Sequence, residues 1–196
     1  MSTAHLERVG SYRLVHLLRL GQTCDLWEVE KATGGDRMAM KFLPRGDRHT
    51  KEEVAFLKNE HVIGSQIEHG SVIRIFDFET VKEGTYMTLE LFKHPNIKQW
   101  VHQGVEVLFP KLEQVIRRCA AGLAAMHDKG FVHRDVKPDN FLMNDEGEIK
   151  LIDFNLAKKR ASGLAKLFSG RTAIQGTRSY MSPEQVRGKT VNERSD

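Results

Sequence analysis

Cysteine is scarce in this sequence, with only Cys24 and Cys119 among 196 residues. The two lie far apart and fit neither a metal-binding nor a disulfide spacing, which is typical of a reducing compartment. The nine histidines also lack the spacing of paired ligands. The sequence therefore predicts neither a disulfide framework nor a zinc site.

Long apolar runs are missing as well. No stretch approaches the roughly 20 apolar residues of a membrane span, and the N-terminus, MSTAHLERVG, lacks the apolar core of a signal peptide. Internal repeats and low-complexity segments are also absent from the sequence. We therefore expect a cytoplasmic protein with no membrane segment in this chain.

The composition is that of a soluble globular protein, with 40% hydrophobic and 29% charged residues. The length suits one domain or two small lobes with a real core. Lysine and arginine exceed aspartate and glutamate by 30 to 26, which suits an anionic partner such as a nucleotide or an acidic peptide. No basic stripe interleaves with aromatic residues, so we expect no nucleic-acid partner.

The patterning changes from strands to helices near residue 92. Alternating or β-rich runs predict strands over 12–20, 24–32, 37–43, 72–79 and 85–92, with a helix at 51–67. Apolar residues at helical spacing predict a second helix over 108–129, followed by short strands at 141–143 and 149–153. We expect an α+β fold with a strand-rich lobe at 1–92 and a mainly helical lobe at 93–196.

The stretch VHRDVKPDNFL, residues 132–142, carries the clearest chemistry. It places an acid (Asp135), a cation (Lys137) and a carbonyl ligand (Asn140) within six positions, in a segment whose Pro138 forbids regular helix. Phosphoryl transfer needs a carboxylate to orient a hydroxyl, a cation for phosphate and oxygen ligands for magnesium. Asp153 supplies a second oxygen ligand, beyond the hairpin MNDEGEIKL.

Here the sequence resembles the eukaryotic-like (Hanks-type) serine/threonine protein kinases. Residues 133–140 match the catalytic-loop pattern H-R-D-L-x-x-x-N, with Val136 in the leucine position. AMK ending at Lys41, DFN at 153–155 and SPE at 182–184 follow in the family's order, and GTRSYMSPEQVRG resembles bacterial members. The resemblance covers nearly the whole chain and implies a two-lobe kinase fold.

The resemblance implies a role for each matching residue. Asp135 would be the catalytic base, Lys137 a contact to the transferred phosphate and a mark of serine/threonine preference, and Thr177 part of the substrate-docking loop. ATP and Mg²⁺ would be required, and a protein with serine or threonine would be the substrate. The remaining catalytic and metal-binding residues would be Lys41 on the α- and β-phosphates, its partner Glu60, and the magnesium ligands Asn140 and Asp153.

The same resemblance implies a nucleotide pocket. Residues 90–92 would form the adenine-binding hinge, with Leu89 as the gatekeeper. The residues expected to bind the nucleotide are Gly21, Leu26, Ala39, Lys41, Glu90, Phe92 and Leu142, of which Leu26, Ala39 and Leu142 would sandwich the base.

The sequence departs from the family pattern at two glycine-dependent places. Asn155 stands where the family has glycine after Asp-Phe. Asparagine is the non-glycine residue best able to enter the left-handed region, so we expect Asn155 to permit the metal-binding conformation of Asp153 while making inversion of the segment harder. The nucleotide-covering loop RLGQTCDLW keeps only Gly21, with Arg19 and Cys24 in the other glycine places. Because glycines let the backbone approach the phosphates closely, we expect a lowered ATP affinity or a misplaced γ-phosphate.

A third departure is at the end of the sequence, where Asp196 falls at the start of the family's central second-lobe helix. We therefore expect a C-terminally truncated kinase that needs the missing helices, or a dimer, for activity. The helix at 108–129 should keep an uncovered apolar face. The basic loop at 155–182 predicts phosphorylation, at Thr172 above all, anchored by Arg134.

Three other functions remain open at this stage. A pseudokinase or nucleotide-binding scaffold is favoured by the glycine losses and disfavoured by the four polar residues Lys41, Asp135, Asn140 and Asp153. A small-molecule kinase is weakened by Lys137 and by the polypeptide-docking segment. A nucleic-acid-binding module is the weakest of the three.

Overall fold

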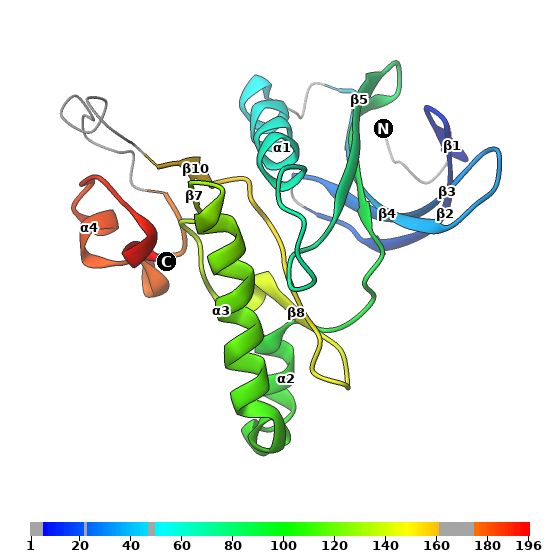
Figure 1. Ribbon diagram of the computed structural model, residues 1–196. Helices are drawn as coiled ribbons and strands as arrows, with labels where there is room; N and C mark the ends of the chain where they lie inside the picture. Colours follow the sequence, from blue (N-terminus) through cyan, green and yellow to red (C-terminus); the bar gives the residue numbers. More distant parts are fainter. Residues whose placement is uncertain (1–5, 22, 47–49, 161–174) are drawn as a thin grey trace. The chain divides into compact units, whose positions relative to one another are not determined.

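The first ninety residues form an antiparallel sheet, as their alternating patterns predict (Figure 1). The computed structural model describes residues 6–21, 23–46, 50–160 and 175–196. Within them the sheet has the strand order β1-β2-β3-β4-β6-β5, with every neighbouring pair antiparallel. The strands are β1 (Arg8–Val9), β2 (Tyr12–Arg19), β3 (Asp25–Lys31), β4 (Arg37–Pro44), β5 (Ile75–Val81) and β6 (Gly84–Glu90).

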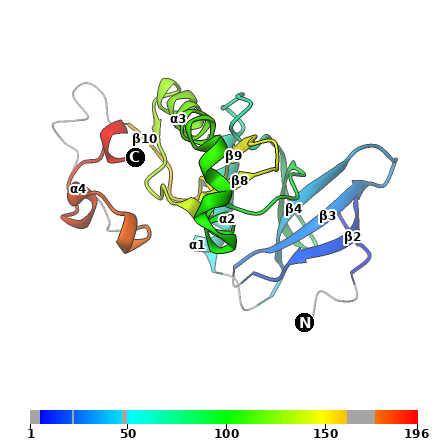
Figure 2. The same cartoon turned by 90° about the horizontal axis from the view of Figure 1, so that it is seen from below.

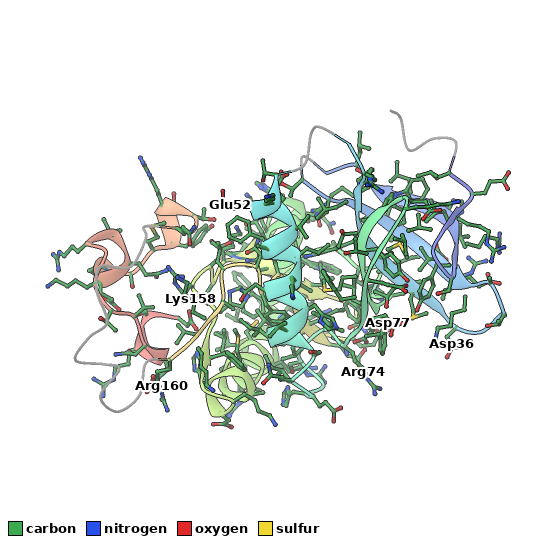
Figure 3. The ribbon with its side chains drawn as sticks, turned by 90° about the horizontal axis from the view of Figure 1, so that it is seen from above. Asp36, Glu52, Arg74, Asp77, Lys158 and Arg160 are labelled. Atoms are coloured by element: carbon green, nitrogen blue, oxygen red, sulfur yellow. The ribbon has the colours of Figure 1, made fainter. Side chains whose placement is uncertain are left out.

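The side chains of these strands form a hydrophobic core. The Tyr12 and Tyr86 rings meet edge to face with centroids 5.7 Å apart, an arrangement that aromatic quadrupoles favour. The Tyr12 hydroxyl donates to Asp77 at 2.5 Å, so its polar end is satisfied (Asp77 is labelled in Figure 3). The core consists of Val9, Tyr12, Leu14, Trp27, Val29, Met40, Phe42 and Tyr86.

Helix α1 (Lys51–Gly64) belongs to the same unit as the sheet and packs against β5 and β6. It begins with a capping box, because the Thr50 side chain accepts from the Glu53 amide and the Glu53 side chain accepts from the Thr50 amide. The helix ends three residues earlier than expected. The residues that follow leave this unit for the other one.

The chain divides into two units, Met1–Ser65 with Arg74–Lys93, and Gln66–Ile73 with His94–Asp196. The expected single boundary after residue 92 is therefore simpler than the observed one. Residues 66–73 join the second unit because the Leu151 amide donates to Ser71 O at 2.8 Å and the Ile73 amide donates to Leu151 O at 3.0 Å. This backbone pairing joins segments about eighty residues apart, so no local sequence pattern predicts it.

Helices α2 and α3 of the second unit lie beside a small hairpin (Figure 2). Helix α3 (Leu112–Asp128) packs on β9 (Ile149–Leu151), and α2 (Ile97–Gln103) packs on β8 (Phe141–Met143). At Gly122 a Cβ would lie 2.9 Å from Ser71 O, so the close approach of α3 requires glycine. The remaining elements are η2 (Val105–Lys111), β7 (Phe131–Val132), η3 (Pro138–Asn140), β10 (Lys158–Lys159), η5 (Arg178–Tyr180), α4 (Pro183–Val186) and η6 (Glu193–Ser195).

The helix expected at 108–129 is in fact two elements. Pro110 lies in the 3₁₀ segment η2, and the α-helix starts only at Leu112. Leu112 and Ile116 are 42% and 59% exposed, so α3 does keep an uncovered apolar face. In the part of the chain that the structure describes, no helix has both the length and the apolar character needed to cross a membrane.

The buried carboxylate of Glu28 accepts hydrogen bonds from the neighbouring strand β4 and from Lys93, the last residue of the first unit. Glu28 on β3 is fully buried, and its Oε1 accepts from Arg37 Nη1 at 2.7 Å while its Oε2 accepts from Lys93 Nζ at 2.5 Å. These hydrogen bonds, from Lys93 first and Arg37 second, hold the pKa of Glu28 below its ordinary value. Lys93 directly follows the expected adenine hinge, so this ion pair fixes the end of that segment.

Glu28→Gln is expected to lower the free energy of unfolding, because it leaves two cations facing one neutral amide. A lowered carboxyl pKa contributes stability above the unfolded pKa and loses it as the pH falls through the folded value. The difference from wild type should therefore be full at pH 7 and smaller at a pH below 4.5, the ordinary pKa of glutamate. Urea titrations at both pH values measure it, with Glu30→Gln, the partly exposed partner of Arg13, as the matched control. Equal losses in both variants would contradict the assignment.

Candidate active site

The loop after β7 turns sharply at Arg134. This residue has a φ of 72°, and it is one of two non-glycine residues with positive φ in the described part of the chain; the other is Asp153. Non-glycine residues hold this conformation only where their surroundings impose it. Pro138 then opens η3, which ends at Asn140. Asp135 and Asn140 are thereby placed at the two ends of one short, irregular segment.

Asp135 is surrounded by hydrogen-bond donors. Its Oδ1 accepts from the Thr177 amide at 2.8 Å and from Thr177 Oγ1 at 2.9 Å. Its Oδ2 accepts from Lys137 Nζ at 2.5 Å and from Asn140 Nδ2 at 3.2 Å. Lys137 Nζ also donates to Thr177 Oγ1 at 2.8 Å. All four lone-pair positions of the carboxylate therefore have a donor.

These donors decide the charge state of Asp135. Burial raises the pKa of the carboxyl, but the hydrogen bonds from Lys137 and Thr177 outweigh it and hold the pKa below the ordinary value of 3.8. Asp135 is therefore ionised at neutral pH. Gly176 makes the approach of Thr177 feasible, because it has a φ of 120° and a Cβ there would lie 2.9 Å from Arg134 O.

The expected metal ligands are neighbours in the second unit. The Ile152 amide, one residue before Asp153, donates to Asn140 O at 3.0 Å. The side-chain amide nitrogen of Asn140 donates to the Asp135 carbonyl at 2.8 Å, which turns its side-chain oxygen away from that bond. An amide oxygen and a carboxylate are the hard ligands that magnesium prefers, with water and phosphate completing its shell. The residues present therefore fit a magnesium ion.

Asn155, which stands in the family's glycine place, does not itself adopt the left-handed conformation. The left-handed residue of this turn is Asp153, with a φ of 69°, and Asn155 is absent from the positive-φ residues of the described chain. Aspartate tolerates this region better than most residues because its side chain is short and polar. Asparagine in the glycine place therefore causes no left-handed strain in this conformation.

His133 is fully buried and links the loop to the turn that carries Asp153. Its Nε2 lies 3.1 Å from Ile152 O and its Nδ1 lies 3.3 Å from the Asp135 amide. A carbonyl only accepts and an amide only donates, so the proton is on Nε2 and Nδ1 is the acceptor. Burial lowers the pKa of His133, which keeps it neutral. The residue thus acts by hydrogen bonding as well as by its edge-on contact with the Phe154 ring.

The first unit holds the expected cation–carboxylate pair. Lys41 Nζ donates to Glu60 Oε1 at 2.5 Å and to Oε2 at 2.7 Å, and the Glu60 side chain is 4% exposed. Of the other glutamates on α1, Glu53 belongs to the capping box and Glu52 lies at the exposed first turn (Figure 3). The register of α1 therefore selects Glu60, which faces Lys41 on β4.

The other expected nucleotide contacts are divided between the two units. In the strand register of the first unit, Lys41 on β4 lies opposite Leu26 on β3, and Ala39 on β4 lies opposite Leu89 on β6. Gly21 sits in a turn so tight that a Cβ would lie 1.9 Å from Cys24 O, so glycine is required there. Glu90 ends β6 and Phe92 follows it, whereas Leu142 lies on β8 of the second unit. The role of each toward a nucleotide stays a prediction.

Asp196 is a residue of this site that the sequence did not indicate. Its fully buried carboxylate accepts from the His133 amide at 2.7 Å, the Arg134 amide at 2.8 Å and His127 Nε2 at 2.9 Å. It therefore holds the backbone of the loop in front of Asp135. The contacts join residues more than sixty positions apart, so no local pattern predicts them.

The basic loop after the turn that carries Asp153 is described only at its two ends. Lys158 and Lys159 form β10, which pairs with β7, and Arg160 forms an ion pair with Glu193 at 3.1 Å (Lys158 and Arg160 are labelled in Figure 3). Arg134 Nη1 donates to Leu156 O at 3.3 Å. The predicted phosphorylation site, Thr172, lies outside the described residues.

Comparison with known proteins gives a consistent result. A family model described as the protein kinase domain matches residues 12–196. Serine/threonine-protein kinase Pkn1 of Myxococcus xanthus is 32% identical over 193 residues, covering 96% of this chain and 27% of that relative. Serine/threonine-protein kinase pkn2 of the same organism is 31% identical over 194 residues, covering 95% and 23%. Probable serine/threonine-protein kinase PknB of Lactococcus lactis is 26% identical over 186 residues, covering 94% and 29%. The chain spans about a quarter of the length of these curated relatives.

Proposed function

This chain belongs to the protein kinase family, and from that premise we propose that it transfers the γ-phosphate of ATP to serine or threonine hydroxyls of a protein substrate. The observation that carries the proposal is the ionised Asp135 carboxylate with Lys137 and Thr177 around it. The curated relatives named above are serine/threonine-protein kinases, which supports the choice of acceptor.

Asp135 is suited to orient the attacking hydroxyl. Its Oδ1 is engaged by two donors of Thr177, whereas its Oδ2 has a short contact to Lys137 and only a 3.2 Å contact to Asn140. The weaker Asn140 contact is the one that a substrate hydroxyl replaces most easily, so Oδ2 is the acceptor for its proton. Lys137, 2.5 Å away, offsets negative charge that develops on the transferred phosphate.

ATP and magnesium are part of the proposal. Asn140 and Asp153 would hold the ion through oxygen, and Lys41, fixed by Glu60, would contact the nucleotide phosphates. When bound, magnesium neutralises charge on the phosphate oxygens. Among the described residues no group of three or more His, Cys, Asp or Glu side chains forms a metal site. Two protein ligands with phosphates and waters suffice for magnesium.

The test is transfer of labelled γ-phosphate from ATP to casein by the purified chain. The expected product is phosphoserine or phosphothreonine, and removal of magnesium with EDTA should abolish its formation. Asp135→Ala, purified identically, controls for contaminating kinases. Label that persists in this control, or its absence from both the 196-residue chain and any longer natural form, would refute the proposal.

A second candidate, a nucleotide-binding scaffold without transfer, is favoured by one observation. Arg19 and Cys24 occupy places where the family has glycine, and Gly21 alone keeps the tight turn of the covering loop. Magnesium–ATP binding without phosphate transfer in the same assay would support this candidate.

A further inference from the structure

The peptide groups on both sides of Arg134 are held by side chains from distant parts of the chain. Its amide donates to Asp196 Oδ1 at 2.8 Å, and its carbonyl accepts from Gln185 Nε2 at 2.8 Å. Arg134 is 3% exposed and Gln185 is 6% exposed, so water replaces neither bond. The left-handed φ of Arg134 and the orientation of the next peptide, which carries Asp135, therefore depend on these two partners.

The other end of the Gln185 side chain is fixed as well. Its Oε1 accepts from the Ser182 amide at 3.0 Å and from Ser182 Oγ at 3.1 Å, closing a capping box at the start of α4 (Figure 1). The Gln185 amide must therefore be oriented with Oε1 toward the donors of Ser182 and Nε2 toward the Arg134 carbonyl, because the reverse orientation would satisfy neither end. Gln185 thus bridges the segment that begins with Thr177 to the loop that carries Asp135.

The chemistry of the bridge requires glutamine. Glutamate would keep the cap on Ser182 but would place a second acceptor against Arg134 O. A shorter asparagine would lack the reach for both ends. An apolar side chain would leave the buried Arg134 carbonyl without its donor.

We propose that Gln185 is a positioning residue for Asp135, transmitting the placement of the Thr177 segment to the catalytic loop through the Arg134 carbonyl. Its effect is on the orientation of Asp135, and Gln185 itself does not contact the reacting atoms. The inference rests on the proposed phosphate transfer. A second readout that does not depend on activity keeps the two claims separable.

The experiment compares wild type with Gln185→Glu, and with Gln185→Met, which keeps the volume without adding charge. The matched control is Gln114→Glu, because the Gln114 amide also donates to a backbone carbonyl, Glu146 O at 3.1 Å, on the exposed side of α3. Both Gln185 variants should lower kcat about 10- to 100-fold. The KM for ATP should stay within about twofold, since a positioning group acts mainly on the transition state. Gln114→Glu should keep the wild-type kcat.

Amide hydrogen exchange measured by mass spectrometry is the second readout. Exchange should become faster in peptides covering residues 132–140 and 176–182 of both Gln185 variants, with no change in peptides from α3. Faster exchange throughout the unit, or unchanged exchange at 132–140 in Gln185→Met, would overturn the inference. If wild type transfers no phosphate, the proposed function fails, and the exchange data still decide the positioning claim.

Discussion

Asp135→Asn is expected to lower kcat by about 10²–10⁴-fold, the range that a positioned general base contributes. The amide has nearly the size of the carboxylate but does not take the proton of the attacking hydroxyl. It also presents an NH₂ group either to the two donors of Thr177 or to Lys137 and Asn140, whichever way it is turned. Steady-state assays at saturating magnesium–ATP measure the loss.

The acid limb of the pH–rate profile checks the same assignment. Because the pKa of Asp135 lies below 3.8, kcat should not fall on account of this residue until the pH is below that value. Thr177→Ala removes one hydroxyl donor and keeps the amide, so its loss of kcat should be smaller than that of Asp135→Asn. Wild-type kcat in Asp135→Asn would remove this residue from the mechanism.

Asp196→Ala is expected to lower the free energy of unfolding by about 3 kcal/mol, because two backbone amides and the His127 ring lose a buried acceptor. For a chain of this size that corresponds to a fall in Tm of about 6–12 °C. The kcat should fall as well, since the left-handed Arg134 loses the partner of its amide. Thermal unfolding followed by circular dichroism measures the first effect.

Asp128→Ala is the matched control for this prediction. Asp128 is also an aspartate of the second unit, but it is exposed and lies at the C-terminal end of α3, where a negative charge opposes the helix dipole. Its removal should leave the Tm unchanged or slightly higher. An Asp196→Ala variant that melts with wild type would show that the loop does not need this carboxylate.

The sequence predicted the parts of the fold and of the site that are encoded locally. The strands and α1 follow from alternation and spacing, and Asp135, Lys137 and Asn140 were found because all three lie in one short, unusual stretch. The pairing of Lys41 with Glu60 was predicted from the resemblance to the kinase family, and in the structure the two side chains form an ion pair. Short α2 was missed. Asn96 caps this helix by accepting from the Gln99 amide at 2.8 Å.

The contacts that the sequence did not predict join distant positions. Asp196 and Gln185 reach the catalytic loop across more than fifty residues, and each sits in a polar stretch with no periodic pattern. The turn around Asn155 shows a second limit. The family motif indicates where a turn has conformational freedom, but only the backbone shows which residue adopts the left-handed conformation, and here that residue is Asp153.

The neutral His133 has a consequence for a cell that becomes acidic. Its imidazole is buried and its Nε2 proton is donated to the Ile152 carbonyl. Because burial lowers the pKa of the ring, a moderate drop in pH leaves the ring neutral and both of its backbone hydrogen bonds intact. The unfolded chain, by contrast, takes up a proton at this histidine once the pH falls below about 6.5. A fall in pH therefore lowers the free energy of unfolding before it changes the charge of Asp135.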